Sequence, residues 1–105
     1  MGGRAGGGAS AGMGSGTRGY GGATQSLYNA ISSGNKTAIG KAKSKLANAI
    51  SKMPTDQVKA FAASASDAAF FSSKQNNPKS EYNATAHKFN QTLANMLNSE
   101  ANKRT

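Results

Sequence analysis

The stretch TAIGKAKSKLANAISKMP, residues 37–54, carries the pattern that decides the fold. Its apolar residues recur every three or four positions, the spacing that brings side chains onto one face of an α-helix. Asn35 or Thr37 can cap the start of this helix, and Pro54 ends it. We expect the apolar face to pack against other helices, and it consists of Ile39, Ala42, Leu46, Ala49, Ile50 and Met53.

A further helix is predicted on each side of this one along the chain. Before it, Thr24 can cap a short helix that runs to Ser33, and Gly34 suits the position that follows a helix end. After it, Thr55 can cap a third helix, in which the negative charge of Asp56 suits the N-terminal end of the helix dipole. We expect the buried face of the third helix to consist of Val58, Phe61, Ala62, Ala65 and Ala69, with Phe70 and Phe71 as its last residues.

The polar run SSKQNNPKS, residues 72–80, predicts a loop, and Ser80 is expected to cap a last helix. No segment alternates apolar and polar residues with the period of a strand, so no sheet is expected. We predict an all-α fold, a small bundle of three to four helices, built by one domain of residues 23–105. Sixteen larger apolar side chains follow Thr24, enough for a small core of low stability. The apolar side of the last helix consists of Tyr82, Ala86, Phe89, Leu93, Met96 and Leu97.

Residues 1–22, MGGRAGGGASAGMGSGTRGYGG, differ sharply in composition from the rest of the chain. They hold eleven of the thirteen glycines and no acidic residue. Glycine loses the most conformational freedom on ordering and brings no apolar side chain to offset that loss. We therefore expect a disordered Gly-rich tail that becomes ordered only with a partner.

The formal net charge of +9 is concentrated in one part of the sequence. Residues 24–54 contain five lysines and no acidic residue. Such an excess is typical of proteins that bind a nucleic acid or a nucleoprotein, or an acidic protein surface, although it also fits an ordinary solvated helix face. Lys41, Lys45 and Lys52 fall within about 40° of one another on a helical wheel, and we call these three the lysine ridge. The predicted binding residues are the ridge together with Lys36, Lys43, Arg4 and Arg18.

The sequence contains no arrangement of residues that predicts catalysis. There is no cysteine, His87 is the only histidine, and the four acidic residues are scattered. We expect His87 to be a surface residue, and no catalytic residue, metal ligand, cofactor or small-molecule substrate is predicted. No apolar run is long enough for a membrane span, and the N-terminus lacks the apolar block of a signal peptide. The expected location is therefore the cytoplasm, without a membrane partner.

Two parts of the N-terminal segment resemble known kinds of protein. GGRAGGG and TRGYGG are similar to the RGG-type tails of RNA-associated proteins, in which arginine meets phosphate and stacks on bases. The opening MGGRAGGGASAGM resembles the Gly/Arg/Ser-rich start of many bacteriophage and mobile-element proteins from Gram-positive gut bacteria, among them minor head proteins and small accessory proteins.

The second resemblance implies a small basic binding protein of a phage or mobile element that acts in the bacterial host cytoplasm. Small non-enzymatic proteins of such elements are frequently inhibitors of host defence. The most concrete function that this resemblance implies is that of an anti-CRISPR protein, an inhibitor of an RNA-guided nuclease of the Cas9 type. The alternative is a virion-associated structural protein whose Gly-rich arm becomes ordered between capsid or portal subunits.

Overall fold

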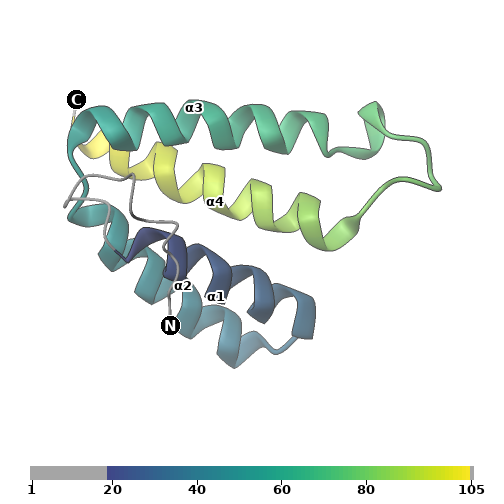
Figure 1. The fold of residues 1–105 in the computed structure, drawn as a ribbon, viewed down its shortest axis with the longest axis horizontal. Helices are drawn as coiled ribbons and strands as arrows, with labels where there is room; N and C mark the ends of the chain where they lie inside the picture. The colour runs from purple at the N-terminus through teal and green to yellow at the C-terminus, as the bar shows by residue number, and fades with distance from the viewer. Residues whose placement is uncertain (1–18, 105) are drawn as a thin grey trace.

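The computed structural model describes residues 19–104, in which four α-helices and one short 3₁₀-helix occur without any strand (Figure 1). This confirms the all-α class and the small helical bundle. The prediction of a disordered tail falls mostly on residues 1–18, which lie outside the described residues. The elements are α1 (Tyr20–Ser33), α2 (Lys36–Ser51), α3 (Thr55–Phe71), η3 (Lys74–Asn76) and α4 (Ala84–Lys103).

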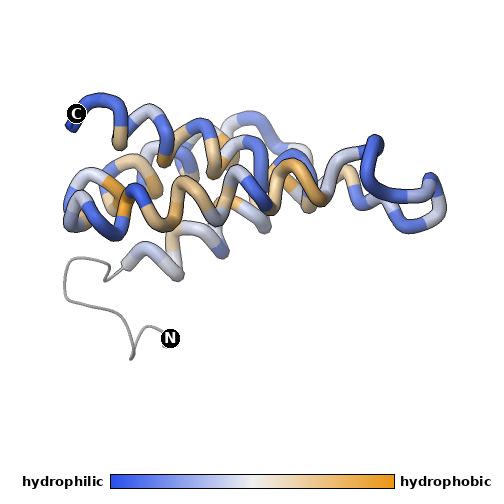
Figure 2. The backbone as a smooth tube through the Cα atoms, turned by 90° about the horizontal axis from the view of Figure 1, so that it is seen from above, coloured by the Kyte–Doolittle hydropathy of each residue, from blue (hydrophilic) through white to orange (hydrophobic). Residues whose placement is uncertain are grey.

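The helices form two hairpins, α1 with α2 and α3 with α4, and α4 also contacts the first hairpin (Figure 1). The turn between α1 and α2 is short because Gly34 adopts a left-handed conformation with φ of 73°, which lets its N–H bond to the carbonyls of Ala30 and Ile31. Figure 1 also shows the α3–α4 hairpin extending past the first hairpin, and Figure 2 shows hydrophilic residues along the loop at this end. Side chains can therefore be enclosed by helices of both hairpins only where the two hairpins overlap.

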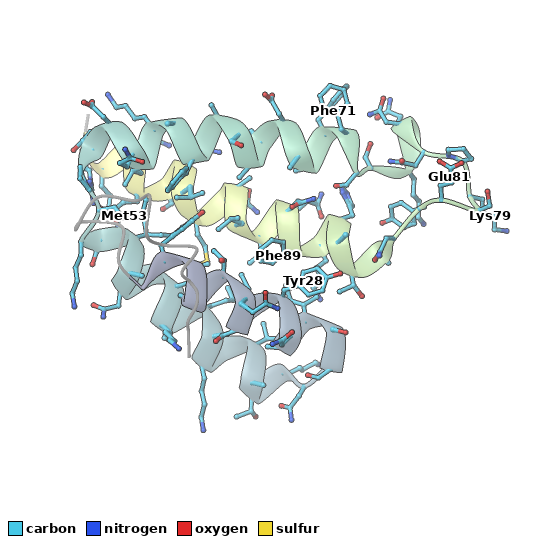
Figure 3. The ribbon with its side chains drawn as sticks, viewed as in Figure 1. Tyr28, Met53, Phe71, Lys79, Glu81 and Phe89 are labelled. Atoms are coloured by element: carbon cyan, nitrogen blue, oxygen red, sulfur yellow. The ribbon has the colours of Figure 1, made fainter. Side chains whose placement is uncertain are left out.

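The core lies where the two hairpins overlap, and every α-helix contributes to it. Buried alanines on the facing surfaces, such as Ala23, Ala62 and Ala94, allow the helices to approach closely. Tyr28 of α1 and Phe89 of α4 point toward each other across the hairpins, with ring centroids 5.3 Å apart and planes at 70° (Figure 3). The largest fully buried side chains are Leu27, Leu46, Ile50, Val58 and Leu97.

The start of the first helix differs from the prediction. Helix α1 begins at Tyr20 and not after Thr24, so the last three residues of the expected tail belong to the bundle. Tyr20 is only 8% exposed, and its ring stacks on that of Phe61 with centroids 4.9 Å apart. Burial of this large ring favours the first turn strongly enough to order Gly21 and Gly22, which are poor helix formers.

The start of the last helix was also predicted wrongly. Asn83, not Ser80, is the N-cap of α4, and its side-chain oxygen accepts a hydrogen bond of 3.0 Å from the N–H of Ala86. The preceding residues form a turn after Pro78, whose carbonyl accepts from the N–H groups of Glu81 and Tyr82. Tyr82 therefore lies in the loop, and the helix starts after this turn, where the Asn83 side chain caps it.

The predicted ends of α2 and α3 agree better with the structure, except that Pro54 and not Thr55 is the N-cap of α3, which has no side-chain cap. Asn35 caps α2 by accepting from the N–H of Ala38 at 3.1 Å, Asp56 lies in the first turn of α3, and α3 ends at Phe71. Phe70 and Phe71 do not join the core, however, since they are 58% and 65% exposed. Phe71 points away from α4 at the end of α3 (Figure 3), and the ring of Phe70 contacts it edge-on with centroids 5.2 Å apart.

The C-terminal end of α4 is attached to the C-terminal end of α2 by the side chain of Arg104. Its guanidinium donates to the carbonyl oxygens of Ile50 and Ser51 at the end of α2 and of Met53 in the turn that follows. The Ile50 oxygen also accepts from the N–H of Met53. Its Nε also donates to Glu100 Oε2 at 2.8 Å, and both side chains are largely buried. No pattern in the sequence indicates this contact, because it joins residues about fifty positions apart.

Candidate nucleic-acid interface

All five lysines predicted to bind a partner are exposed and lie on α2 or at its C-cap. Within residues 19–104 the only ion pairs are those of Glu100 with Lys103 and Arg104. None of the five lysine ammonium groups is therefore neutralised by a carboxylate in this part of the chain. The other two predicted residues, Arg4 and Arg18, lie outside the described residues.

The acidic residues all lie on the second hairpin. Asp56 and Asp67 belong to α3, Glu81 to the loop before α4, and Glu100 to α4. The α1–α2 hairpin thus carries only positive charge, whereas the α3–α4 hairpin carries both signs. Because the two hairpins occupy different sides of the molecule (Figure 1), one side presents a basic surface.

The structure separates the five lysines into two groups on opposite flanks of α2. At roughly 100° per residue, Lys36 and Lys43 share one flank, and the lysine ridge lies on the other. Lys41 and Lys45 of the ridge line a groove of about 510 Å³ between α1 and α2, whereas Lys52 lies beyond it at the helix end. The other wall of the groove is formed by Ser26, Asn29 and Ser33 of α1. These three residues were not predicted as site residues, although their spacing of three and four places them on one helix face.

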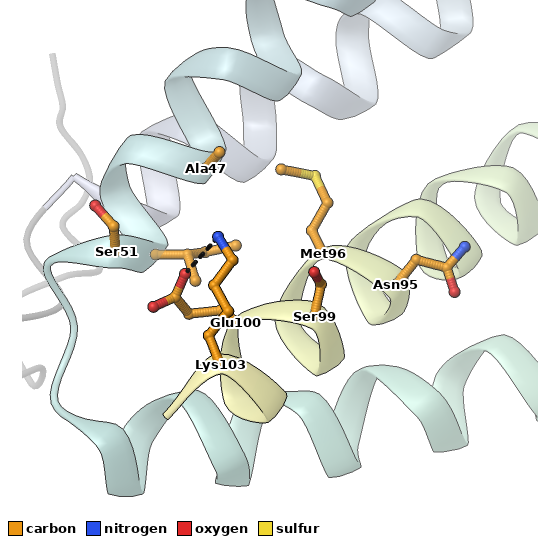
Figure 4. A pocket seen from close by; sticks show the side chains of 8 residues that line it. Ala47, Ser51, Asn95, Met96, Ser99, Glu100 and Lys103 are labelled. Atoms are coloured by element: carbon orange, nitrogen blue, oxygen red, sulfur yellow. Dashed lines mark ion pairs between the residues drawn. The ribbon is translucent and has the colours of Figure 1, made fainter. Parts of the chain in front are cut away.

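A second groove, of about 320 Å³, lies between α2 and α4 (Figure 4). Its lining includes the apolar side chains of Ala47, Ile50 and Met96 and the charged side chains of Glu100 and Lys103. The Lys103 ammonium is 3.8 Å from Glu100 Oε1, so the positive charge there is offset by a negative one. This groove is therefore less suited to an anion than the groove that holds Lys41 and Lys45.

His87 is half-buried and not the surface residue that the sequence suggested. Its Nδ1 lies 2.9 Å from the hydroxyl oxygen of Ser72, at the end of α3. The same hydroxyl bonds to the carbonyl of Ala69 at 3.2 Å and accepts from the side-chain amide of Asn90 at 3.3 Å. The Ser72 hydroxyl is therefore fully used in hydrogen bonds, and those with His87 and Asn90 join the end of α3 to α4.

Neither a metal-binding cluster nor a membrane-spanning helix is found in residues 19–104. No group of three or more His, Asp or Glu side chains there is arranged to hold a metal ion. No helix in the same range combines the length and the apolarity needed to cross a membrane. Comparison of the chain with protein-family models, with curated proteins and with solved structures finds no match.

Proposed function

We propose that this protein acts by binding a nucleic acid or a nucleoprotein through α2, and not by catalysis. The observation that supports the proposal is the α1–α2 hairpin, with five exposed lysines and no carboxylate paired with them in the described residues. Each lysine that pairs with a phosphate releases a counterion held by the nucleic acid, so such a surface favours binding. The same charge also suits an acidic protein surface, and direct binding to nucleic acid distinguishes the two.

The test is the affinity of the protein for a labelled DNA duplex, measured by fluorescence anisotropy at several salt concentrations. Three to seven phosphate contacts give a slope of about −3 to −6 when the logarithm of the binding constant is plotted against that of the salt concentration. Replacement of Lys41, Lys45 and Lys52 together by Gln keeps helix propensity and removes only charge. The slope of this variant should shrink by up to about 3.

The matched control replaces Lys59, Lys79 and Lys88 by Gln. These three lysines are also exposed but belong to α3, the loop and α4. The control removes the same charge from the other hairpin and should keep the slope of the parent. Undetectable binding of the parent at low salt, or equal losses in the two triple variants, would contradict the proposal.

The more specific function that we propose is inhibition of an RNA-guided nuclease, with guide RNA, target DNA or an acidic surface of the nuclease as the partner. A basic protein cannot imitate DNA, so it has to bind one of these three. The test is target cleavage by a nuclease–guide complex preincubated with the protein. Reduced cleavage supports this function, and cleavage at the full rate in large molar excess of the protein would remove it.

A further inference from the structure

The groove between α1 and α2 contains hydrogen-bond donors on both of its walls. On the α2 wall, Lys41 and Lys45 each present an ammonium group without a partner in residues 19–104. On the α1 wall, the Ser26 hydroxyl is half-buried and makes no hydrogen bond to another described residue. Asn29 accepts from the amide of Gln25 through its Oδ1 at 3.2 Å, which leaves the NH₂ group of Asn29 as a donor.

The third polar residue of the α1 wall is already occupied. The Ser33 hydroxyl donates to the carbonyl of Ala30 at 2.7 Å and accepts from the N–H of Asn35 at 3.2 Å. The groove therefore offers four donor side chains, two of them cationic, and no carboxylate lines it. This combination suits an anion with several acceptor oxygens.

The spacing of the two cations indicates what kind of anion the groove fits. Lys41 and Lys45 are one helical turn apart, a rise of about 6 Å along α2. This separation suits two successive phosphates on one strand better than a single isolated phosphate. Ala30, Ala38 and Ala42 line the space between the donors, and their small side chains leave room for the sugar and phosphate chain.

We propose that this groove binds the phosphate backbone of one nucleic-acid strand. Lys41 and Lys45 pair with successive phosphates, and Ser26 and Asn29 donate to phosphate oxygens between the helices. This inference rests on the proposed function and narrows it to one flank of α2. Because phosphate contacts carry no base information, binding through the groove has no sequence preference.

The test uses the full chain and the labelled duplex at several salt concentrations, with two double variants. Replacement of Lys41 and Lys45 by Gln removes two phosphate contacts, so the slope should shrink by about 1.8. Replacement of Ser26 and Asn29 by Ala removes only neutral donors. This variant should bind about tenfold more weakly with the slope unchanged, because hydrogen bonds to charged groups are lost while the charge is kept.

Replacement of Lys59 and Lys88 by Gln is the control for loss of two charges elsewhere, and the helical circular-dichroism signal of each variant verifies folding. A smaller slope after Lys41→Gln/Lys45→Gln, together with weaker binding after Ser26→Ala/Asn29→Ala, supports the groove. Parental affinity of the Ser26→Ala/Asn29→Ala variant would overturn the groove while leaving the proposed function standing. No binding of the parent to the duplex would remove both proposals.

Discussion

The Nη2 atom of Arg104 lies 3.1 Å from the carbonyl oxygen of Ile50, a residue 54 positions earlier in the chain. A helix leaves its last four carbonyls without partners inside the helix, and here the Arg104 side chain donates to two of them, those of Ile50 and Ser51. Glu100 lies one turn earlier at the same end of α4, and its ion pair with Arg104 holds the guanidinium in place. One arginine thus caps α2 and fixes the position of α4 against it.

Replacement of Arg104 by Met should lower the free energy of unfolding by about 2 kcal/mol or more, because three hydrogen bonds to carbonyls and the largely buried ion pair with Glu100 are lost at once. The measurement is the urea unfolding midpoint. Lys103→Met is the control, since the Lys103 side chain is 72% exposed and its pair with Glu100 is long at 3.8 Å. The control should change stability by no more than about 0.5 kcal/mol, and equal effects of the two variants would contradict the capping role.

Tyr20 should make stability depend on pH at the alkaline end. Burial raises the pKa of its phenol from 10.0 to about 12. The folded state therefore holds this proton more tightly than the unfolded state. The resulting contribution, about 3 kcal/mol, is complete below pH 10 and is lost as the pH rises to 12.

Tyr20→Phe keeps the ring that stacks on Phe61 and removes the titrating group. The free energy of unfolding, measured with urea from pH 9 to 12, should therefore fall more steeply for the parent than for this variant. Parallel curves would mean that the phenol is open to solvent.

Removal of residues 1–22 should destabilise the protein, because it deletes a buried aromatic ring of the core.

The cap of α4 gives a direct comparison of the sequence prediction with the structure. Asn83→Ala should cost about 1 kcal/mol, since the N–H of Ala86 loses its acceptor. Ser80→Ala should cost no more than about 0.5 kcal/mol, because this side chain is exposed and caps no helix. Thermal melting followed by circular dichroism measures both, and the reverse order would restore Ser80 as the cap.

The contact between Tyr28 and Phe89 should be measurable as a coupling energy between the two hairpins. Edge-to-face aromatic pairs contribute about 0.5 to 1.5 kcal/mol beyond the area they bury. A double-mutant cycle with Tyr28→Ala, Phe89→Ala and the double variant isolates this energy. Strict additivity of the two single effects would mean that the rings do not meet. Phe89→Ala alone should cost less than the roughly 3 to 5 kcal/mol of a fully buried ring, since Phe89 is half-buried.

The local signals in the sequence predicted the local parts of the fold. The apolar stripe of α2, the Asn35 cap and the Asp56 position depend on residues within a few turns of one another, and all three agree with the structure. Tyr20 was missed because its neighbours are glycines, and only the distant ring of Phe61 explains why they are ordered. The contacts of Arg104 were also missed because they are distant in sequence, since a partner such as Ile50 lies in the other hairpin.

The sequence predicted only the α2 wall of the candidate groove and not its α1 wall. Lys41 and Lys45 followed from charge and helical spacing along one segment. Ser26 and Asn29 face them from α1, and no pattern within either helix could indicate that pairing. The prediction of both walls would have required the register between α1 and α2, which the turn at Gly34 sets.

The arrangement as two hairpins has a consequence for the speed of folding. Most of the close contacts join helices that follow each other in sequence, α1 with α2 and α3 with α4. Chains dominated by such short-range contacts collapse quickly, because little loop entropy is lost before the first contacts form. We expect each hairpin to assemble first and the two to dock last through Tyr28 and Phe89. Weakening of that pair should therefore accelerate unfolding in stopped-flow experiments and leave the refolding rate almost unchanged.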